Sequence, residues 1–100
     1  MLEIATNVDG DTVELKLEGR LDVKAAKDAD TAFTQAAEMA PNVVLNLENL
    51  DYIASAGLRA LKRLRSAVRA NGGSLLVRNT QETVMEVFEM TGFAAMLTFE

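Results

Sequence analysis

Hydrophobic and polar side chains alternate with a period of two near the start of the chain. The alternating positions are Val13, Leu15 and Leu17 on one side and Glu14, Lys16 and Glu18 on the other. This period is typical of a strand with one buried face, and residues 2–6 and 11–18 are both predicted to be strands. The Asp9-Gly10 pair between them favours a tight turn, so we expect an antiparallel hairpin.

The apolar spacing then changes to that of a helix over residues 23–39. Its predicted inward face consists of Ala25, Ala29, Phe33 and Ala36. Asp22 is well placed to be the N-cap of this helix, and Pro41 requires the helix to end before it. The next apolar run, "NVVLNL" at 42–47, is rich in β-branched valine and is predicted to be a strand buried on both faces.

A second helix is predicted from Ser55 or Ala56 to Ala70. Its inward stripe is Leu58, Leu61, Leu64 and Val68. Asn71-Gly72-Gly73 ends this helix, and "SLLVRN" at 74–79 follows as a strand.

A third helix is predicted over residues 80–90, with Asn79 or Thr80 as its cap. Asn79 and Glu82 have the spacing of a capping box. Its inward positions are Val84, Val87 and Phe88. Gly92 ends this helix, and "AAMLTF" at 94–99 is expected to be the last strand.

The predicted order is therefore β-β-α-β-α-β-α-β, an α/β fold. Strands joined by helices pair in parallel through right-handed crossovers. If sequence neighbours are also neighbours in the sheet, the helices lie mainly on one face of a mixed five-stranded sheet with one antiparallel N-terminal strand. Such sheets place ligand and partner contacts at the carboxyl ends of their strands, and Ser55 directly follows one of those ends.

Composition excludes several classes of protein. One hundred residues fit a single domain over 1–100. Without cysteine or histidine the chain cannot form a thiolate metal site or a Ser-His-Asp triad, and we expect no metal, cofactor or catalytic residue. A net charge of −5 argues against nucleic acid as a partner. The chain has no signal peptide and no apolar run that could insert into a membrane, so a cytoplasmic location is expected.

Ser55 stands among three of the smallest residues, Ala54, Ala56 and Gly57, where the second helix is predicted to begin. One interpretation is that Ser55 caps the helix. The other is that its small neighbours leave the hydroxyl open to a molecule that approaches closely. The same helix has a basic face, which is either solvated or meets an acidic partner. That face consists of Arg59, Lys62, Arg63 and Arg69.

Four segments together resemble the STAS domain of bacterial anti-sigma-factor antagonists. They are "LEGRLD" at 17–22, "VVLNLENLDYIASAGLRAL" at 43–61, "NGGSLLVRN" at 71–79 and "VFEMTGF" at 87–93. The family signature is Asp-Ser-Ser/Ala-Gly-Leu, and its first serine is phosphorylated. Aligned on Gly57-Leu58, that serine is Ser55, and Ala54 replaces the preceding Asp.

The resemblance implies one STAS-type β-α superhelical domain that acts in partner switching. The unphosphorylated protein, a monomer when free, binds an anti-sigma factor that is also a serine kinase. The kinase phosphorylates Ser55 and releases the protein, and a serine phosphatase resets it. The partner-binding residues implied are Asp22, Ala54, Ser55, Ala56, Gly57, Leu58 and Arg59. A phosphate suits a helix start, but adds about −1.5 to −2 charges to a small, nearly apolar surface.

Two alternatives remain open at this point. Within the family, the chain could be a docking subunit of another assembly, such as the small cytoplasmic partner of an ABC-type lipid transporter, with Ser55 unmodified. Outside it, the chain could be a small enzyme or a nucleotide-binding protein. Because the sequence has no glycine-rich phosphate loop, no histidine and no convergent pair of carboxylates, we expect a protein that is not an enzyme.

Overall fold

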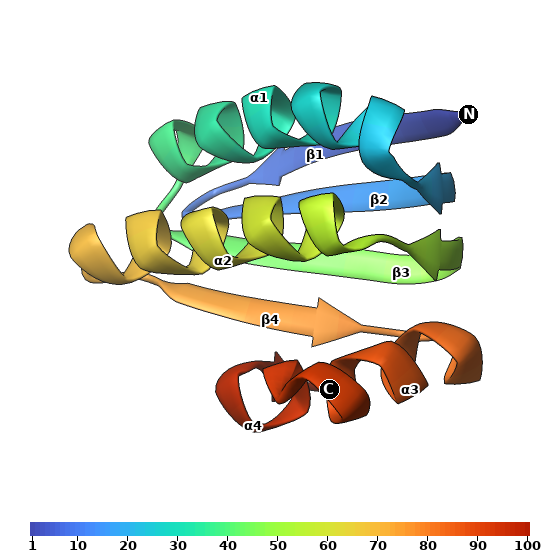
Figure 1. The fold of residues 1–100 in the computed structure, drawn as a ribbon. Coiled ribbons are helices and arrows are strands. Elements are labelled where there is room, and N and C mark those ends of the chain that lie inside the picture. Colours follow the sequence, from blue (N-terminus) through green and yellow to red (C-terminus); the bar gives the residue numbers. More distant parts are fainter.

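The computed structural model describes residues 1–100 and contains one sheet with helices packed against it (Figure 1). In chain order the elements are β1 (Leu2–Asp9), β2 (Thr12–Leu21), α1 (Val23–Met39), β3 (Asn42–Ile53), α2 (Ser55–Ala70), β4 (Ser74–Arg78), α3 (Glu82–Thr91), α4 (Phe93–Met96) and β5 (Thr98–Phe99). The five-stranded sheet has the order β1-β2-β3-β4-β5. β1 is antiparallel to β2, and all other neighbours are parallel. The predicted fold class is confirmed.

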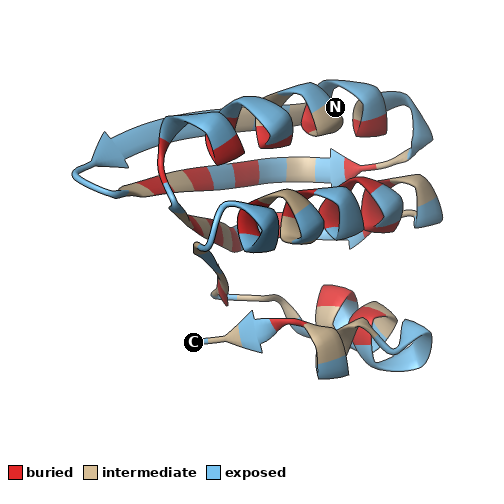
Figure 2. Ribbon diagram, turned by 90° about the vertical axis from the view of Figure 1, so that its left-hand side faces the viewer, coloured by how far each residue is buried: buried red, intermediate tan, exposed pale blue.

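The hydrophobic core lies between the sheet and the helices. Figure 2 shows the buried residues on the sides of α1 and α2 that face the sheet. The predicted stripe of α2 is buried, and Phe33 of α1 and Phe88 of α3 are the largest fully buried side chains. On α1 the buried face includes Ala26 and Ala37, whereas Ala25 is only half-buried. The 3.6-residue period therefore located the core on these helices to within one position.

The face of the sheet opposite α1 and α2 carries polar side chains that bind one another. Asn46 Nδ2 donates to Glu14 Oε2 at 3.3 Å, and Ser74 Oγ donates to Asn42 Oδ1 at 2.9 Å. The prediction that 42–47 is buried on both faces is therefore wrong. Val43, Leu45 and Leu47 are buried, but the residues between them are only half-buried, because the helices cover one face.

The caps and the last strand also differ from the sequence prediction. α3 begins at Glu82 with Gln81 as its N-cap, so neither Asn79 nor Thr80 caps it and no capping box forms. Asn79 instead has a left-handed backbone (φ 59°), and its side chain donates to Asn46 Oδ1 at 3.2 Å. Gly92 ends α3 as predicted, with φ 84°.

The expected strand over 94–99 is confined to Thr98–Phe99. Residues 93–96 form the short helix α4 instead, because the Leu97 N–H bonds to the Phe93 carbonyl at 3.0 Å and closes a helical turn. The Phe93 ring packs 6.4 Å from the ring of Phe88, measured between centroids. This packing of the half-buried Phe93 ring against the buried Phe88 ring favours the turn over an extended strand.

Candidate functional site

The carboxyl ends of β2 and β3 bring the two longest helices to a common starting point. Leu21 and Ile53 are paired in the parallel ladder, and the Ala54 N–H donates to the Leu21 carbonyl at 2.9 Å. Asp22 and Ala54 therefore follow adjacent strand ends, and α1 and α2 begin side by side (Figure 1). This geometry brings Asp22 next to the predicted site segment 54–59.

Asp22 is the N-cap of α1, as predicted. Its backbone is extended, and its Oδ1 accepts a hydrogen bond from the Ala25 N–H at 2.9 Å. This bond is the main reason why the pKa of Asp22 lies below its ordinary value; partial desolvation opposes it, and the N-terminal amine and Arg20 lower the pKa further. The carboxylate is thus held charged at the edge of the site, and its contact with a partner remains a prediction.

We expect the variant Asp22→Asn to show the effect of this charge as a pH-dependent difference in the free energy of unfolding. Asn caps helices as well as Asp, so only the charge is lost. Because the folded-state pKa is lowered, the stabilisation by the charge is present above the ordinary pKa of 3.8 and is lost as pH falls through the folded-state value. Urea unfolding should show the wild type as more stable than the variant at neutral pH, with a gap that closes in acid. A gap independent of pH would contradict this assignment.

Ser55 is the first residue of α2, but it does not cap it. Ala54 has the extended backbone of an N-cap (φ −95°, ψ 169°), and its carbonyl accepts the first helical bond, from the Leu58 N–H at 3.0 Å. The interpretation of Ser55 as N-cap is therefore wrong by one position. Since alanine has no acceptor, no side chain caps α2. The exposed Ser55 hydroxyl lies at the positive end of a helix dipole whose first N–H groups lack an intrahelical partner.

Gly57 and Leu58 lie in the core, and their contact with a partner remains a prediction. A Cβ atom on Gly57 would lie 2.6 Å from Leu21 Cγ and 3.0 Å from Ile53 Cγ1. The missing side chain of Gly57 thus leaves room for these two side chains of the sheet. Leu58 is 6% exposed. Of the other predicted contacts, Ser55 and Arg59 are exposed and Asp22, Ala54 and Ala56 are half-buried.

Three exposed apolar side chains near the start of α1 and the carboxyl ends of β2 and β3 were missed in the sequence. Met1 is 96% exposed, Val23 70% and Tyr52 40%. The Arg20 guanidinium lies 4.2 Å from the centroid of the Tyr52 ring, and the Arg20 N–H donates to the Met1 carbonyl. The predicted strand 42–47 ends too early. A strand predicted as far as Ile53 would have included Tyr52, which pairs with Arg20 in the ladder. This end of the sheet therefore exposes apolar side chains.

The site does not have the make-up of a metal centre. No group of three or more His, Cys, Asp or Glu side chains in the chain is placed to hold a metal ion. Separately, none of the helices has the length and apolar character that crossing a membrane requires.

Comparison with known proteins gives a match to the STAS domain family over residues 3–100. The chain is 43% identical over 54 residues to BtrV of Bordetella bronchiseptica, named as an anti-sigma factor antagonist. That match covers 54% of this chain and 47% of BtrV, about half of each. It is 26% identical over 97 residues to the anti-sigma-B factor antagonist of Staphylococcus aureus, covering 96% of this chain and 90% of the relative.

Among solved structures, the fold is similar to that of the Bacillus anti-sigma factor antagonist SpoIIAA. Its unphosphorylated form matches with a TM-score of 0.75 and 20% identity, over 100% of this chain and 87% of SpoIIAA. The phosphorylated form matches with a TM-score of 0.74 at the same 20% identity, over 100% of this chain and 91% of that one. At this level of identity the likeness concerns the fold.

Proposed function

This chain belongs to the STAS domain family, and on that premise we propose that it is an anti-sigma-factor antagonist controlled by phosphorylation of Ser55. In this proposal the unmodified chain binds an anti-sigma factor that is also a serine kinase. Phosphorylation of Ser55 releases the complex, and a serine phosphatase restores the hydroxyl. The named relatives, both anti-sigma factor antagonists, support the first part.

The observation that carries the proposal is the exposed Ser55 hydroxyl on the uncapped first turn of α2. A phosphate there would have free N–H groups and the positive end of the dipole beside it, so the fold should tolerate it. It would also add about −1.5 to −2 charges where the surface is otherwise small and nearly apolar. After phosphorylation the chain would therefore stay folded, whereas its complex with the anti-sigma factor would dissociate.

A direct assay tests both parts of the proposal. The chain is incubated with an anti-sigma factor kinase from the same genome and ATP labelled in the γ-phosphate. We expect the phosphoryl group to move to Ser55 Oγ, with release of ADP, and the variant Ser55→Ala to remain unlabelled. A stable complex without any labelling would favour the second candidate function, a docking subunit of another assembly in which the same helix start binds without modification.

The variant Ala54→Asp restores the aspartate of the family signature and should be phosphorylated faster on Ser55. Because Ala54 occupies the N-cap and lacks an acceptor, an aspartate there should raise the free energy of unfolding by about 1 kcal/mol. It should also speed phosphorylation, if the carboxylate positions the hydroxyl or the incoming phosphoryl group. Its effect on affinity should be about 1 kcal/mol or less, as for an exposed charge at the rim of an interface.

Ala54→Asn separates these effects, because it caps the helix without adding a charge. We expect Ala54→Asn to share the stabilisation but not the faster labelling. If Ala54→Asp were labelled no faster and bound far more weakly, Ala54 would be a contact residue instead.

A further inference from the structure

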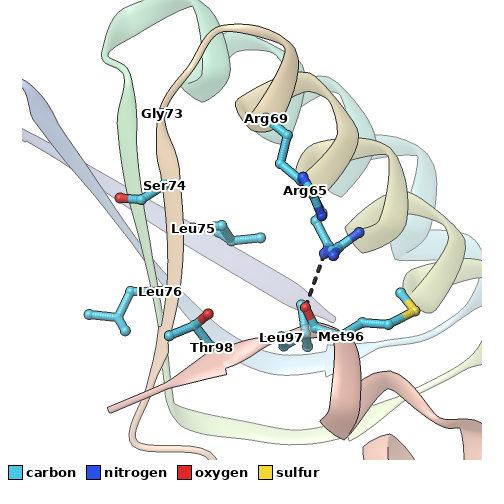
Figure 3. Close-up of a pocket in the computed structure, with 9 residues that line it drawn as sticks. All are labelled: Arg65, Arg69, Gly73, Ser74, Leu75, Leu76, Met96, Leu97 and Thr98. Carbon is cyan, nitrogen blue, oxygen red and sulfur yellow. Dashed lines mark hydrogen bonds between the residues drawn. The ribbon is translucent and has the colours of Figure 1, made fainter.

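A second candidate surface lies at the other end of α2. A groove of about 450 Å³ runs between the last turns of α2, the start of β4 and the α4–β5 segment (Figure 3). Its walls include Arg65, Arg69, Ser74, Leu75, Met96 and Thr98, and no acidic residue lines it. Ser55 and Arg69 are separated by 14 helical residues, which corresponds to about 20 Å along the axis. The groove is therefore distinct from the site around Ser55.

Two guanidinium groups face this groove without a carboxylate partner. Arg65 Nε donates to the Met96 carbonyl at 3.0 Å, which fixes this side chain at the wall of the groove (Figure 3). Arg69 is exposed, and neither arginine belongs to any ion pair in the structure. By contrast, Arg63 on the same helix pairs with Asp30 at 2.9 Å. The groove thus keeps two positive charges, one helical turn apart, available for an anion.

The base of the groove is apolar and borders an open part of the sheet edge. Leu75 and Met96 are only half-buried. β5 pairs with Leu76 and Val77 alone, so the Ser74–Leu75 end of β4 has no neighbouring strand on the side away from β3. An occupant could therefore bury apolar surface against Leu75 and Met96 while its anionic groups meet the two arginines.

The positive surface continues beyond the groove along α2. A second hollow on this helix is lined by Arg59, Lys62, Ser66 and Arg63, of which Arg63 is paired with Asp30. Half of the ten basic residues of the chain lie on α2, which has no acidic residue, although the net charge of the chain is −5. With 16 residues, α2 is about 24 Å long. A positive surface of this length suits an extended polypeptide segment better than a small anion.

We propose that the groove binds an acidic segment of a partner protein, with carboxylates on Arg65 and Arg69 and an apolar side chain against Leu75 and Met96. This contact goes beyond the function proposed for Ser55 and does not depend on phosphorylation. The charge complementarity would also accelerate association with an acidic partner.

The test uses the ¹⁵N-labelled chain and a ten-residue capped peptide of alternating Glu-Glu and Leu-Leu pairs. Saturable amide shifts should gather at Arg69, Leu75, Met96 and Thr98. Arg69→Gln should weaken binding at least about fivefold, because an ion-paired hydrogen bond is lost. Lys24→Gln removes the same charge from the exposed face of α1 and should change affinity less than about twofold. The same peptide with Gln in place of Glu should not bind.

Three outcomes would overturn the proposal. One is the absence of saturable shifts, and another is an equal effect of Arg69→Gln and Lys24→Gln, which would mean unspecific attraction. The third is that sodium decanoate, a single carboxylate on an apolar chain, shifts the same amides at lower concentration than the peptide. The groove would then be a site for a small amphiphile. The ¹H–¹⁵N spectrum of each variant reports its folding in the same experiment.

Discussion

Replacing Gly57 by valine is expected to lower the free energy of unfolding by about 2–3 kcal/mol, as overpacking of a tight core does. For a domain of this size, that corresponds to a fall in melting temperature of roughly 10–20 °C. The first added atom would already lie 2.6 Å from Leu21 Cγ. Leu21 is 1% exposed and Ile53 4%, so neither side chain can move aside into solvent. α2 would have to shift away from the strands that position it.

Ser66→Val is the matched control, because Ser66 lies on the exposed face of the same helix. Thermal unfolding followed by circular dichroism should show a small change for Ser66→Val and a large one for Gly57→Val. Partner binding by Gly57→Val should then be judged only below its own melting temperature. If Gly57→Val kept its stability and lost only partner binding, Gly57 would after all lie in the interface.

Ser55→Asp should leave the fold intact and weaken the complex with the anti-sigma factor at least tenfold, or about 1.4 kcal/mol. An aspartate in the first turn is favourable for α2, because its charge interacts with the positive end of the helix dipole. The loss of affinity would come from burying a charge in an interface that Ser55, Ala54 and Ala56 leave small and nearly uncharged. Isothermal titration calorimetry with the purified partner measures it.

Two variants control for the added charge and the lost hydroxyl. Ser66→Asp adds the same charge three turns further along α2 and should weaken the complex much less. Ser55→Ala should bind about as well as the wild type, because it keeps the surface small. Equal affinity of Ser55→Asp and the wild type would count against Ser55 as the switch.

The sequence predicted those parts of the fold in which one periodic signal dominates. The helix over 23–39 was predicted with its observed bounds, because Asp22 and Pro41 mark both of its ends. The stripe of α2 was also predicted, because Leu58, Leu61 and Leu64 repeat at helical spacing. The order of strands was predicted on the condition that sequence neighbours are also neighbours in the sheet, and the structure fulfils that condition.

The parts that the sequence could not predict depend on contacts between distant segments. Whether Ala54 or Ser55 caps α2 is decided by the bond from the Ala54 N–H to the Leu21 carbonyl, which lies more than 30 residues earlier in the chain. Gly57 faces Leu21 for the same reason. Neither contact has a local signature in "IASAGL", where a run of small residues fits an open surface and a tightly packed one equally well.

The consecutive order of the strands matters during synthesis of the chain. Both strands and both helices that meet at Ser55 lie within the first 70 residues. Each strand after β1 therefore pairs with one already made. At about 5–20 residues per second, residues 71–100, which hold β4, α3, α4 and β5, take roughly 2–6 s to translate. The segments that meet at Ser55 are therefore synthesised before the β4–β5 edge of the sheet.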